Sequence, residues 1–393
     1  MNLPLLALFL AAFAVGTTEF IIAGMLPQVA ADLHITVASA GLLISGYAAG
    51  VALGGPVVAI LTTELERRAT LIGRMRGGSA GNAGGALSPS YGWLLAARVV
   101  IACTHGALLG YATVMATRLV AGDRQARAIA FVLSGLMIAN IVGVPAGTAL
   151  GAAYGWRTTF WAIAILGGVS TVGIAVLLPR GESGGEEKPG LASEFAVLAR
   201  QEVYLSMLMI IGASLAYFVV FAYVAPLLIE TAGVTQEKLP LVLSLLGVGA
   251  LVAILAGGRL ADWKLMPSII GMLVLQVVVA LALPFVIHSP FVAGAALFVW
   301  SATGIALVAA PLQARILKGA HAAPNLAATL ISSAFNIGIS CGAALGASAL
   351  VHGFGYDDLP WLGLVGVVPA LLLAFVARSL DRRGGVAARP APA

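Results

Sequence analysis

The chain has 393 residues, of which 60% are hydrophobic and only 9% are charged, and its mean hydropathy is +1.03. A soluble domain carries about 25% charged residues, so this chain has too few polar side chains to cover a surface in water, and a soluble fold is excluded. The net charge of +5 does not indicate nucleic-acid binding, because the Lys and Arg residues are scattered over many short loops, as membrane insertion predicts.

Apolar runs of about 20 residues, the length of a transmembrane helix, recur along the chain. The first run starts beside the N-terminus with no basic residue before it, so we expect a retained span rather than a signal peptide. Eleven runs are clear, and a further segment at 69–92 is doubtful. The clear runs cover residues 3–25, 38–61, 93–117, 128–150, 158–178, 203–229, 240–261, 267–287, 290–313, 325–351 and 360–378.

The distribution of positive charge favours counting 69–92 as a twelfth span. With twelve spans and a cytoplasmic N-terminus, the outside loops hold only Arg157 and Lys238. Without that span, Arg67 and Arg68 would lie opposite the later positive residues, against the positive-inside rule. The cytoplasmic side then holds Arg67, Arg68, Arg118, Arg124, Arg127, Arg180, Lys188, Arg200, Arg259, Lys264, Arg315, Lys318, Arg378, Arg382, Arg383 and Arg389.

The doubtful segment, which reads ATLIGRMRGGSAGNAGGALSPSYGW from residue 69, contains Arg74, Arg76 and five glycines between Gly77 and Gly85. Two arginines at mid-depth cost roughly 5–7 kcal/mol on the insertion scale, although snorkelling toward the inner surface reduces that cost. Two interpretations stay open: a marginal span carried by its neighbours, or a local error in the sequence record, such as a short frame slip.

The chain divides into two halves at its longest polar connection, which follows the sixth span. The fifth and eleventh spans both carry small residues at a spacing of four, a pattern that lets another helix approach closely. Such internal repetition is typical of secondary transporters, whose binding site lies between the halves near mid-membrane; ordinary glycine-rich packing is the alternative. The small residues are Ala139, Gly143, Gly147 and Gly151 in the fifth span, and Ala334, Gly338, Gly342 and Gly346 in the eleventh.

The predicted fold is therefore an all-α integral membrane protein with twelve transmembrane helices in two pseudo-symmetric six-helix bundles. The predicted parts are an N-terminal bundle at 1–180, a cytoplasmic linker at 181–200, a C-terminal bundle at 201–384 and a disordered cytoplasmic tail at 385–393.

Glu19 is the only one of the 16 acidic residues that falls well inside a predicted span. A carboxyl group withheld from water is able to hold a proton near neutral pH, and a buried acid that binds and releases a proton is the simplest coupling device for a pump. The alternative is a neutral Glu that only fixes helix packing through hydrogen bonds to Thr17 or Thr18.

Arg98 and His105 are seven residues apart on the fourth span and so share a helix face. Arg98 keeps its charge, whereas His105 can titrate near neutrality. If this face meets the first span, Glu19, Arg98 and His105 form a buried polar set for proton coupling. The alternatives are an Arg98 that snorkels to the outer interface beside Trp93, and a neutral core histidine.

Further polar and aromatic residues inside the spans predict a cavity lining that suits a moderately apolar ligand. Each of them alone is also compatible with simple packing. We recognise no metal-ligand spacing, phosphate-binding loop or nucleophile triad, so we expect neither a metal site nor a cofactor nor enzymatic activity. The candidate cavity residues are Tyr47, Asn140, Tyr217, Phe221, Trp300 and Asn336.

Five motifs make the chain resemble the major facilitator superfamily, and within it the drug-proton antiporter branch of arabinose-efflux, purine-efflux and chloramphenicol-resistance transporters. The resemblance covers nearly the whole chain and does not specify a substrate. The motifs are GTTEFIIAGMLPQVAADL, ARVVIACTHGALLG, ANIVGVPAGTALG followed by YGWRTTFWA, GGRLAD, and SSAFNIGISCGAALGA.

The resemblance implies two bundles that rock between inward-open and outward-open states around a central cavity. It implies that Glu19 is the family's first-span acid and Arg98 its fourth-span arginine, which is tied to proton coupling. It also implies an antiporter signature at Gly143, Pro145 and Gly147, and a gating loop from Gly258 to Asp262. The first-half copy of that loop departs from the pattern, because Thr63 replaces an Asp and Glu66 a Gly.

We therefore expect a monomeric, proton-coupled efflux antiporter of a bacterial inner membrane, with both termini in the cytoplasm and no nucleic-acid partner. Its partners are protons, the lipid bilayer and a small, moderately apolar solute or drug such as chloramphenicol. One alternative is an uptake symporter for a sugar or nucleoside. Another is a non-transporting membrane sensor, impaired at the third span.

Overall fold

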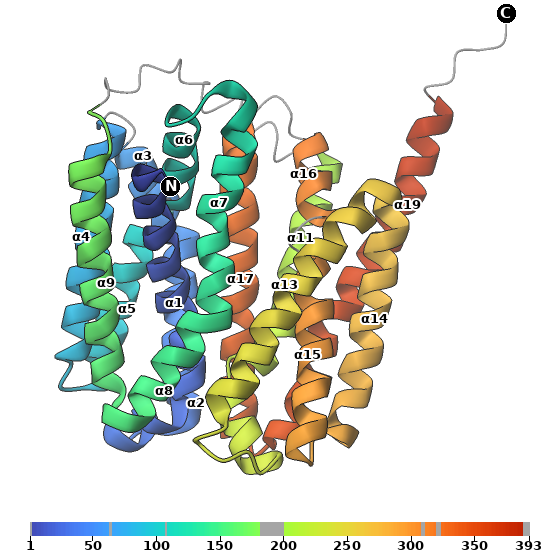
Figure 1. The fold of residues 1–393 in the computed structure, drawn as a ribbon. Helices are drawn as coiled ribbons and strands as arrows, with labels where there is room; N and C mark the ends of the chain where they lie inside the picture. Colours follow the sequence, from blue (N-terminus) through green and yellow to red (C-terminus); the bar gives the residue numbers. More distant parts are fainter. Residues whose placement is uncertain are drawn as a thin grey trace, which may run out of the picture.

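The computed structural model describes residues 2–62, 65–106, 108–180, 200–307, 311–319 and 324–387. Within these ranges the regular structure is helical and contains no strand (Figure 1), which confirms the all-α prediction. Residues 181–199 of the predicted linker and 388–393 of the predicted tail lie outside the described residues, as does Thr63. The last helix extends to Ala387, three residues into the predicted tail.

The N-terminal half contains α1 to α9. Its elements are α1 (Leu3–Asp32), α2 (Val37–Ala49), the π turn η1 (Gly50–Gly54), α3 (Gly55–Leu61), α4 (Arg67–Ala86), α5 (Tyr91–His105), α6 (Leu108–Arg118), η2 (Gly122–Arg124), α7 (Gln125–Ile138), the π turn η3 (Ala139–Gly143), α8 (Val144–Tyr154) and α9 (Trp156–Leu177).

The C-terminal half contains α11 to α19. Its elements are α11 (Gln201–Phe221), α12 (Val224–Pro226), the π turn η4 (Leu227–Thr231), α13 (Leu239–Trp263), α14 (Leu265–Val286), α15 (Pro290–Leu307), α16 (Gln313–Gly319), α17 (Pro324–Val351), η6 (Tyr356–Asp358), α18 (Leu359–Leu362) and α19 (Leu364–Ala387).

Ten helical segments of the described chain are long and apolar enough to cross a membrane, and a shorter apolar helix spans Pro290–Gly304. With α4, which is helical but less apolar, a helical segment stands at each of the twelve predicted spans. The positions of the spans were therefore predicted correctly, and the doubtful third span is a helix.

The glycines of α4 allow this polar helix to lie close to α5 and α9. A Cβ atom at Gly77 would meet the Thr104 side chain of α5 at 2.7 Å, and one at Gly85 would meet the Phe160 ring of α9 at 2.9 Å. The helix is therefore packed in the manner of a genuine span. The alternative of an error in the sequence record stays a prediction that resequencing tests.

Arg74 of α4 is buried, with 4% of its surface exposed, and the two terminal nitrogens of its guanidinium find partners inside the protein. It donates to Thr62 Oγ1 at 3.0 Å and to the Thr104 carbonyl at 3.3 Å, and it lies 5.2 Å from the centre of the Tyr111 ring. Arg76 is exposed. The insertion cost expected for Arg74 is therefore reduced by hydrogen bonds and a cation–π contact rather than by snorkelling.

The two small-residue ridges occupy equivalent places in the two halves. Gly147 of α8 packs against Ile21 of α1, the first helix of the N-terminal half, and Gly342 of α17 packs against Leu215 of α11, the first helix of the C-terminal half. The spacing-four pattern thus places the same pair of helices together in each half, which supports the predicted internal repeat.

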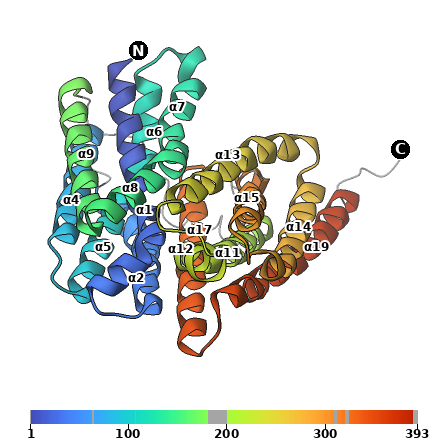
Figure 2. The ribbon, with the colours of Figure 1, turned by 60° about the horizontal axis from the view of Figure 1, so that its bottom comes forward.

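The two halves meet mainly along α2 with α17 and along η3 and α8 with α13 (Figure 2). Ser45 of α2 hydrogen-bonds Ser340 of α17, donating to its carbonyl at 2.9 Å. Pro56 has no N–H, so the carbonyl of Ala52, four residues earlier, loses its helical partner and instead accepts from Ser333 Oγ at 3.2 Å. A backbone carbonyl that proline leaves without a helical partner in one half is thus hydrogen-bonded by a side chain of the other half.

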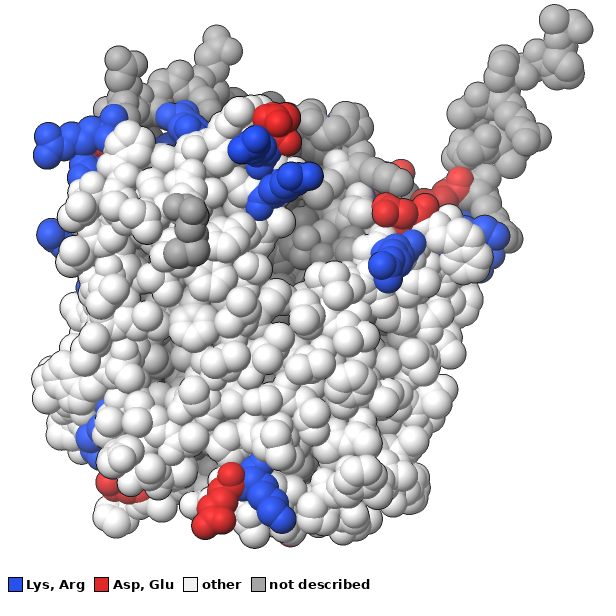
Figure 3. All heavy atoms as spheres, in the orientation of Figure 1, with Lys and Arg blue, Asp and Glu red and all other residues white. Residues whose placement is uncertain are grey.

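The halves diverge toward the end of the molecule at which the two termini lie (Figure 1). On the face shown in Figure 3, most Lys and Arg side chains gather at this end, and uncharged surface covers the middle of the molecule. Arg157 and Lys238, the two positive residues expected outside, lie at the starts of α9 and α13, at the opposite end (Figure 1).

We expect Gly342→Ala to lower the free energy of unfolding by about 1–3 kcal/mol, a typical cost of overpacking. The new Cβ would lie 2.6 Å from the Leu215 carbonyl oxygen, a backbone atom of α11 that cannot move aside cheaply. The measurement is thermal unfolding in detergent.

Gly271→Ala is the matched control, because nothing lies within 4 Å of a Cβ at that helical position. It should be neutral or slightly stabilising. Equal melting temperatures for the two variants would show that the ridge of α17 is not a close contact.

Candidate functional site

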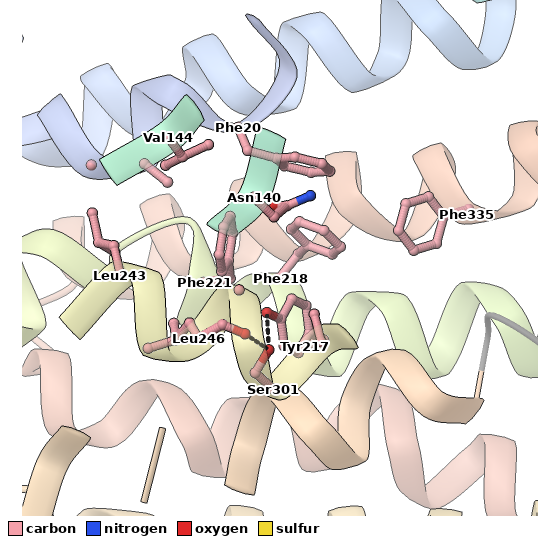
Figure 4. A pocket seen from close by; sticks show the side chains of 14 residues that line it. Phe20, Asn140, Val144, Tyr217, Phe218, Phe221, Leu243, Leu246, Ser301 and Phe335 are labelled. Carbon is pink, nitrogen blue, oxygen red and sulfur yellow. Dashed lines mark hydrogen bonds between the residues drawn. The ribbon is translucent and has the colours of Figure 1, made fainter. Parts of the chain in front are cut away.

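A pocket lies between the two halves, with lining residues from both of them (Figure 4). Its cavity volume is about 40 Å³, which is below the roughly 300–1,000 Å³ of a site for a drug-sized ligand. The lining residues are Phe20, Ala23, Gly24, Asn140, Val144, Tyr217, Phe218, Phe221, Leu243, Leu246, Gly247, Ala250, Ser301 and Phe335.

Aromatic rings dominate this pocket. Phe20 of α1 stacks on Phe218 of α11 with ring centres 5.9 Å apart and meets Phe221 edge-on at 5.8 Å. Tyr217 stacks on Phe221 at 5.5 Å, and Phe335 of α17 meets Phe218 edge-on at 5.6 Å. Such rings offer large apolar faces to a ligand.

A few polar groups lie among the rings. The Tyr217 hydroxyl and Ser301 Oγ are 3.3 Å apart, and Ser301 also donates to the Leu246 carbonyl at 2.7 Å. Asn140 donates its Nδ2 to the Leu136 carbonyl at 3.0 Å, which leaves its amide oxygen to face a ligand. The pocket lining contains no charged residue, so its chemistry suits an uncharged, partly aromatic molecule.

The structure brings three of the six candidate cavity residues together in this pocket, namely Asn140, Tyr217 and Phe221. Trp300 is buried behind Tyr217, with ring centres 6.4 Å apart. Tyr47 and Asn336 also lie outside the lining: Tyr47 is buried inside the N-terminal half, and Asn336 donates to the Ser332 carbonyl of its own helix at 3.0 Å.

Phe20, Phe218, Ser301 and Phe335 line the pocket but were not among the sequence candidates. Phe218 and Phe221 are three residues apart on one helix, so their shared face was a usable signal. Phe20 and Phe335 carried no such signal, because a phenylalanine in an apolar span is equally suited to lipid or to helix packing.

Arg98 of α5 is fully buried, with 0% of its surface exposed. Its two terminal nitrogens donate to the carbonyls of Thr18 and Glu19 on α1, the latter at 3.2 Å, and its guanidinium lies 4.2 Å from the centre of the Tyr47 ring. The condition for a buried polar set, that this face of the fourth span meets the first span, is therefore fulfilled, and the alternative of an Arg98 that snorkels to the interface is wrong.

Glu19 lies on α1 beside Phe20, a residue of the pocket, and is partly exposed. Thr17 and Thr18 donate their hydroxyls to carbonyls of their own helix at 2.8 Å, those of Phe13 and Ala14. Neither hydroxyl is hydrogen-bonded to the Glu19 carboxyl, so the contact expected by the packing-only alternative is not made. Within the described part of the chain, the Glu19 carboxyl has no hydrogen bond or ion pair, and Arg98 is the cation that acts on it.

His105 is buried on the same face of α5 and reaches the polar set through Tyr47, whose hydroxyl lies 2.9 Å from His105 Nδ1. From the sequence, the grouping of Glu19, Arg98 and His105 was conditional on the meeting of the two spans, and the residue between Arg98 and His105 was not identified. Tyr47 joins Arg98 and His105 by lying under the guanidinium and against the imidazole.

The predicted antiporter signature lies where α7 passes through η3 into α8. Gly143 packs against Thr17 and Phe13 of α1, and Pro145 follows the π turn. The predicted gate residues Gly258 and Asp262 lie near the end of α13, on the side of the molecule where the two chain termini lie (Figure 1). Asp262 is exposed there.

Comparison with known proteins identifies relatives over nearly the full length. A family model described as Major Facilitator Superfamily matches residues 8–347. The chain is 38% identical to the inner membrane transport protein YdhP of Escherichia coli (strain K12), over 96% of both proteins, and 35% identical to the chloramphenicol resistance protein of Streptomyces lividans, over 97% of both.

The fold is similar to that of a solved bacterial homologue of the human lysosomal transporter Spinster, in an inward-facing and unoccupied conformation. The TM-score is 0.74, with 16% identity, over 99% of this chain and 98% of that one.

We expect Glu19→Gln and Arg98→Met to affect stability non-additively. Removing the guanidinium leaves the Glu19 carboxylate without its nearby cation, a penalty that vanishes once the carboxylate is absent. Thermal unfolding of both single variants and the double variant should give a coupling of about 0.5–3 kcal/mol. Additive effects would mean that the two groups act independently.

Proposed function

The chain belongs to the major facilitator superfamily, whose members are transporters and not enzymes, and from that premise we propose that it exports a small, moderately apolar solute from a bacterium in exchange for protons. The pocket between the halves carries this proposal, because it combines aromatic rings with hydroxyl and amide groups and lies beside the acid Glu19.

The solute that suits this pocket is uncharged. Phe20, Phe221 and Tyr217 offer stacking faces, Asn140 offers an amide oxygen, and Ser301 a hydroxyl group. The chloramphenicol resistance protein of Streptomyces lividans is a relative, and chloramphenicol has this mixture of an aromatic ring and polar groups, so it is the first compound to test.

In the proposed cycle, the outward-facing state takes up a proton at Glu19, which weakens the attraction between its carboxylate and Arg98 and favours reorientation. Substrate binding and proton release inside then favour the return. Glu19 and Phe20 are neighbours on α1, so a substrate that displaces the ring also changes the surroundings of the carboxyl. This adjacency supports competition between substrate and proton.

Alternating access is supported by how the halves meet. They are held together along α2 and α17 and diverge toward the terminal end (Figures 1 and 3), which we propose is cytoplasmic because it carries most of the positive charge. The pocket has to widen when a substrate enters, since its volume of about 40 Å³ holds little more than water. A monomer contains both halves and is the proposed working unit.

Two alternatives stay open to measurement. An uptake symporter for a sugar or nucleoside would accumulate labelled solute in cells that carry the gene, whereas an exporter lowers accumulation. A non-transporting sensor would bind solute without flux in proteoliposomes. A susceptibility and accumulation panel with chloramphenicol, purine analogues and pentoses, with and without the gene, separates these functions.

We expect Glu19→Gln to fold but to lose transport driven by a pH gradient, because an amide neither binds nor releases a proton in this range. Solute counterflow without a pH gradient should persist. Both are measured in proteoliposomes with the solute that the panel identifies. Undiminished pH-driven transport by this variant would refute the coupling role of Glu19.

We expect Phe20→Ala to raise the transport KM by roughly two- to tenfold, since an aromatic pair contributes about 0.5–1.5 kcal/mol. Phe375→Ala is the matched control, because Phe375 of α19 is 49% exposed and outside the pocket. A KM that shifts equally in both variants would place substrate binding elsewhere.

A further inference from the structure

A second, much smaller pocket lies entirely inside the N-terminal half, between α1, α4, α5 and α9. Its cavity volume is about 10 Å³, the space of about one water molecule. Polar side chains reach it from three of the four helices, namely Thr18 of α1, Ser79 and Asn82 of α4, and His105 of α5. No residue of the aromatic pocket takes part in it.

Two oxygen atoms at this pocket are buried without a partner. Asn82 is 2% exposed, and its Nδ2 already donates to the Gly78 carbonyl at 2.9 Å and to Thr18 Oγ1 at 3.4 Å. Its Oδ1, like Ser79 Oγ, has no hydrogen-bond partner among the described residues. A buried polar atom left in this condition costs about 1–3 kcal/mol, so the pair indicates a missing partner.

The third polar atom is Nε2 of His105. Because Nδ1 lies against the Tyr47 hydroxyl, Nε2 is the ring nitrogen that remains for the pocket. It lies next to Gly78, where even a Cβ atom would come within 2.6 Å of it. The glycine therefore creates the space in which this nitrogen sits.

The chemistry of the site suits a neutral ligand that can both donate and accept hydrogen bonds. The groups around the His105 ring are Arg98 on its own helix, Arg74 on α4 and Tyr47 on α2, with Glu19 on α1 beyond Arg98. Two guanidinium groups disfavour a bound cation, and the amide oxygen of Asn82 disfavours an anion. Water fits both the volume and the bonding pattern.

We propose that this pocket holds one ordered water molecule, which accepts a hydrogen bond from His105 Nε2 and donates to Asn82 Oδ1 and Ser79 Oγ. This bridge fixes His105 as a neutral imidazole with its proton on Nε2, so that Nδ1 accepts from the Tyr47 hydroxyl. Tyr47 is thereby held under the guanidinium of Arg98. In this arrangement His105 is a positioning residue for Tyr47 and Arg98, and it does not carry the transported proton.

The direct test is solid-state NMR of the full-length protein in lipid, with ¹⁵N-labelled histidine rings and the His105 signal identified by its loss in His105→Asn. The expected signal is the neutral Nε2–H tautomer between about pH 5 and 8, with magnetisation exchange between Nε2–H and water. A protonated ring, the Nδ1–H tautomer or the absence of water contact would each overturn the proposal. This readout requires no transport, so it stands even if the proposed function fails.

Two variants of Asn82 distinguish loss of the water bridge from a nonspecific disturbance of helix packing. Asn82→Leu should remove the water contact and mix the two tautomers, whereas Asn82→Ser, which keeps an oxygen acceptor, should restore the wild-type signal. Asn336→Leu is the matched control, because Asn336 is equally buried and also has an unpartnered amide oxygen, but in the other half. An unchanged signal in Asn82→Leu would contradict the bridge.

A transport measurement separates positioning from proton carrying at His105. Asparagine places an oxygen acceptor near the position of Nδ1, whereas glutamine extends toward the position of Nε2. His105→Asn should therefore retain the pH profile of transport, and His105→Gln should lose pH-driven transport. Loss of pH-driven transport in both variants, with Arg98 and Glu19 intact, would overturn the positioning role.

Discussion

A polar group inside a lipid-embedded bundle has no water to bind, so it must find its partner within the protein. This constraint explains the main features of the molecule. Arg98 is fully buried and bound to two carbonyls of α1, Arg74 is bound to Thr62 and to the Thr104 carbonyl, and the Ala52 carbonyl released by proline is bound by Ser333 of the other half. Each of these bonds also fixes two helices relative to each other.

Glycine supports this packing, because it lets neighbouring helices approach closely. Gly78 leaves room for the His105 ring, and Gly247 of α13 lies against the backbone of Asn140, where a Cβ would be 2.6 Å from the carbonyl oxygen. The composition of α4, rich in both Arg and Gly, is thus consistent with a span. The glycines let α5 and α9 lie close to α4, and the Thr104 carbonyl of α5 then accepts a hydrogen bond from Arg74.

The aromatic pocket and the polar set are separate but share α1. The pocket lies between the halves, whereas Arg98, Tyr47 and His105 lie inside the N-terminal half. Glu19 and Phe20 are consecutive residues at the boundary between the two. The proposed solute site and the proposed proton site are therefore chemically distinct but adjacent along α1.

The sequence by itself determined the membrane class, the twelve helical segments and the two-half repeat, because hydropathy, charge asymmetry and residue spacing act along the chain. Only the tertiary structure decided which polar residues face the pocket. Tyr47 and Asn140 are both polar residues in apolar spans, yet Asn140 lines the pocket and Tyr47 lies under Arg98. Helix rotation and partners distant in sequence set this difference, and spacing within one helix does not encode them.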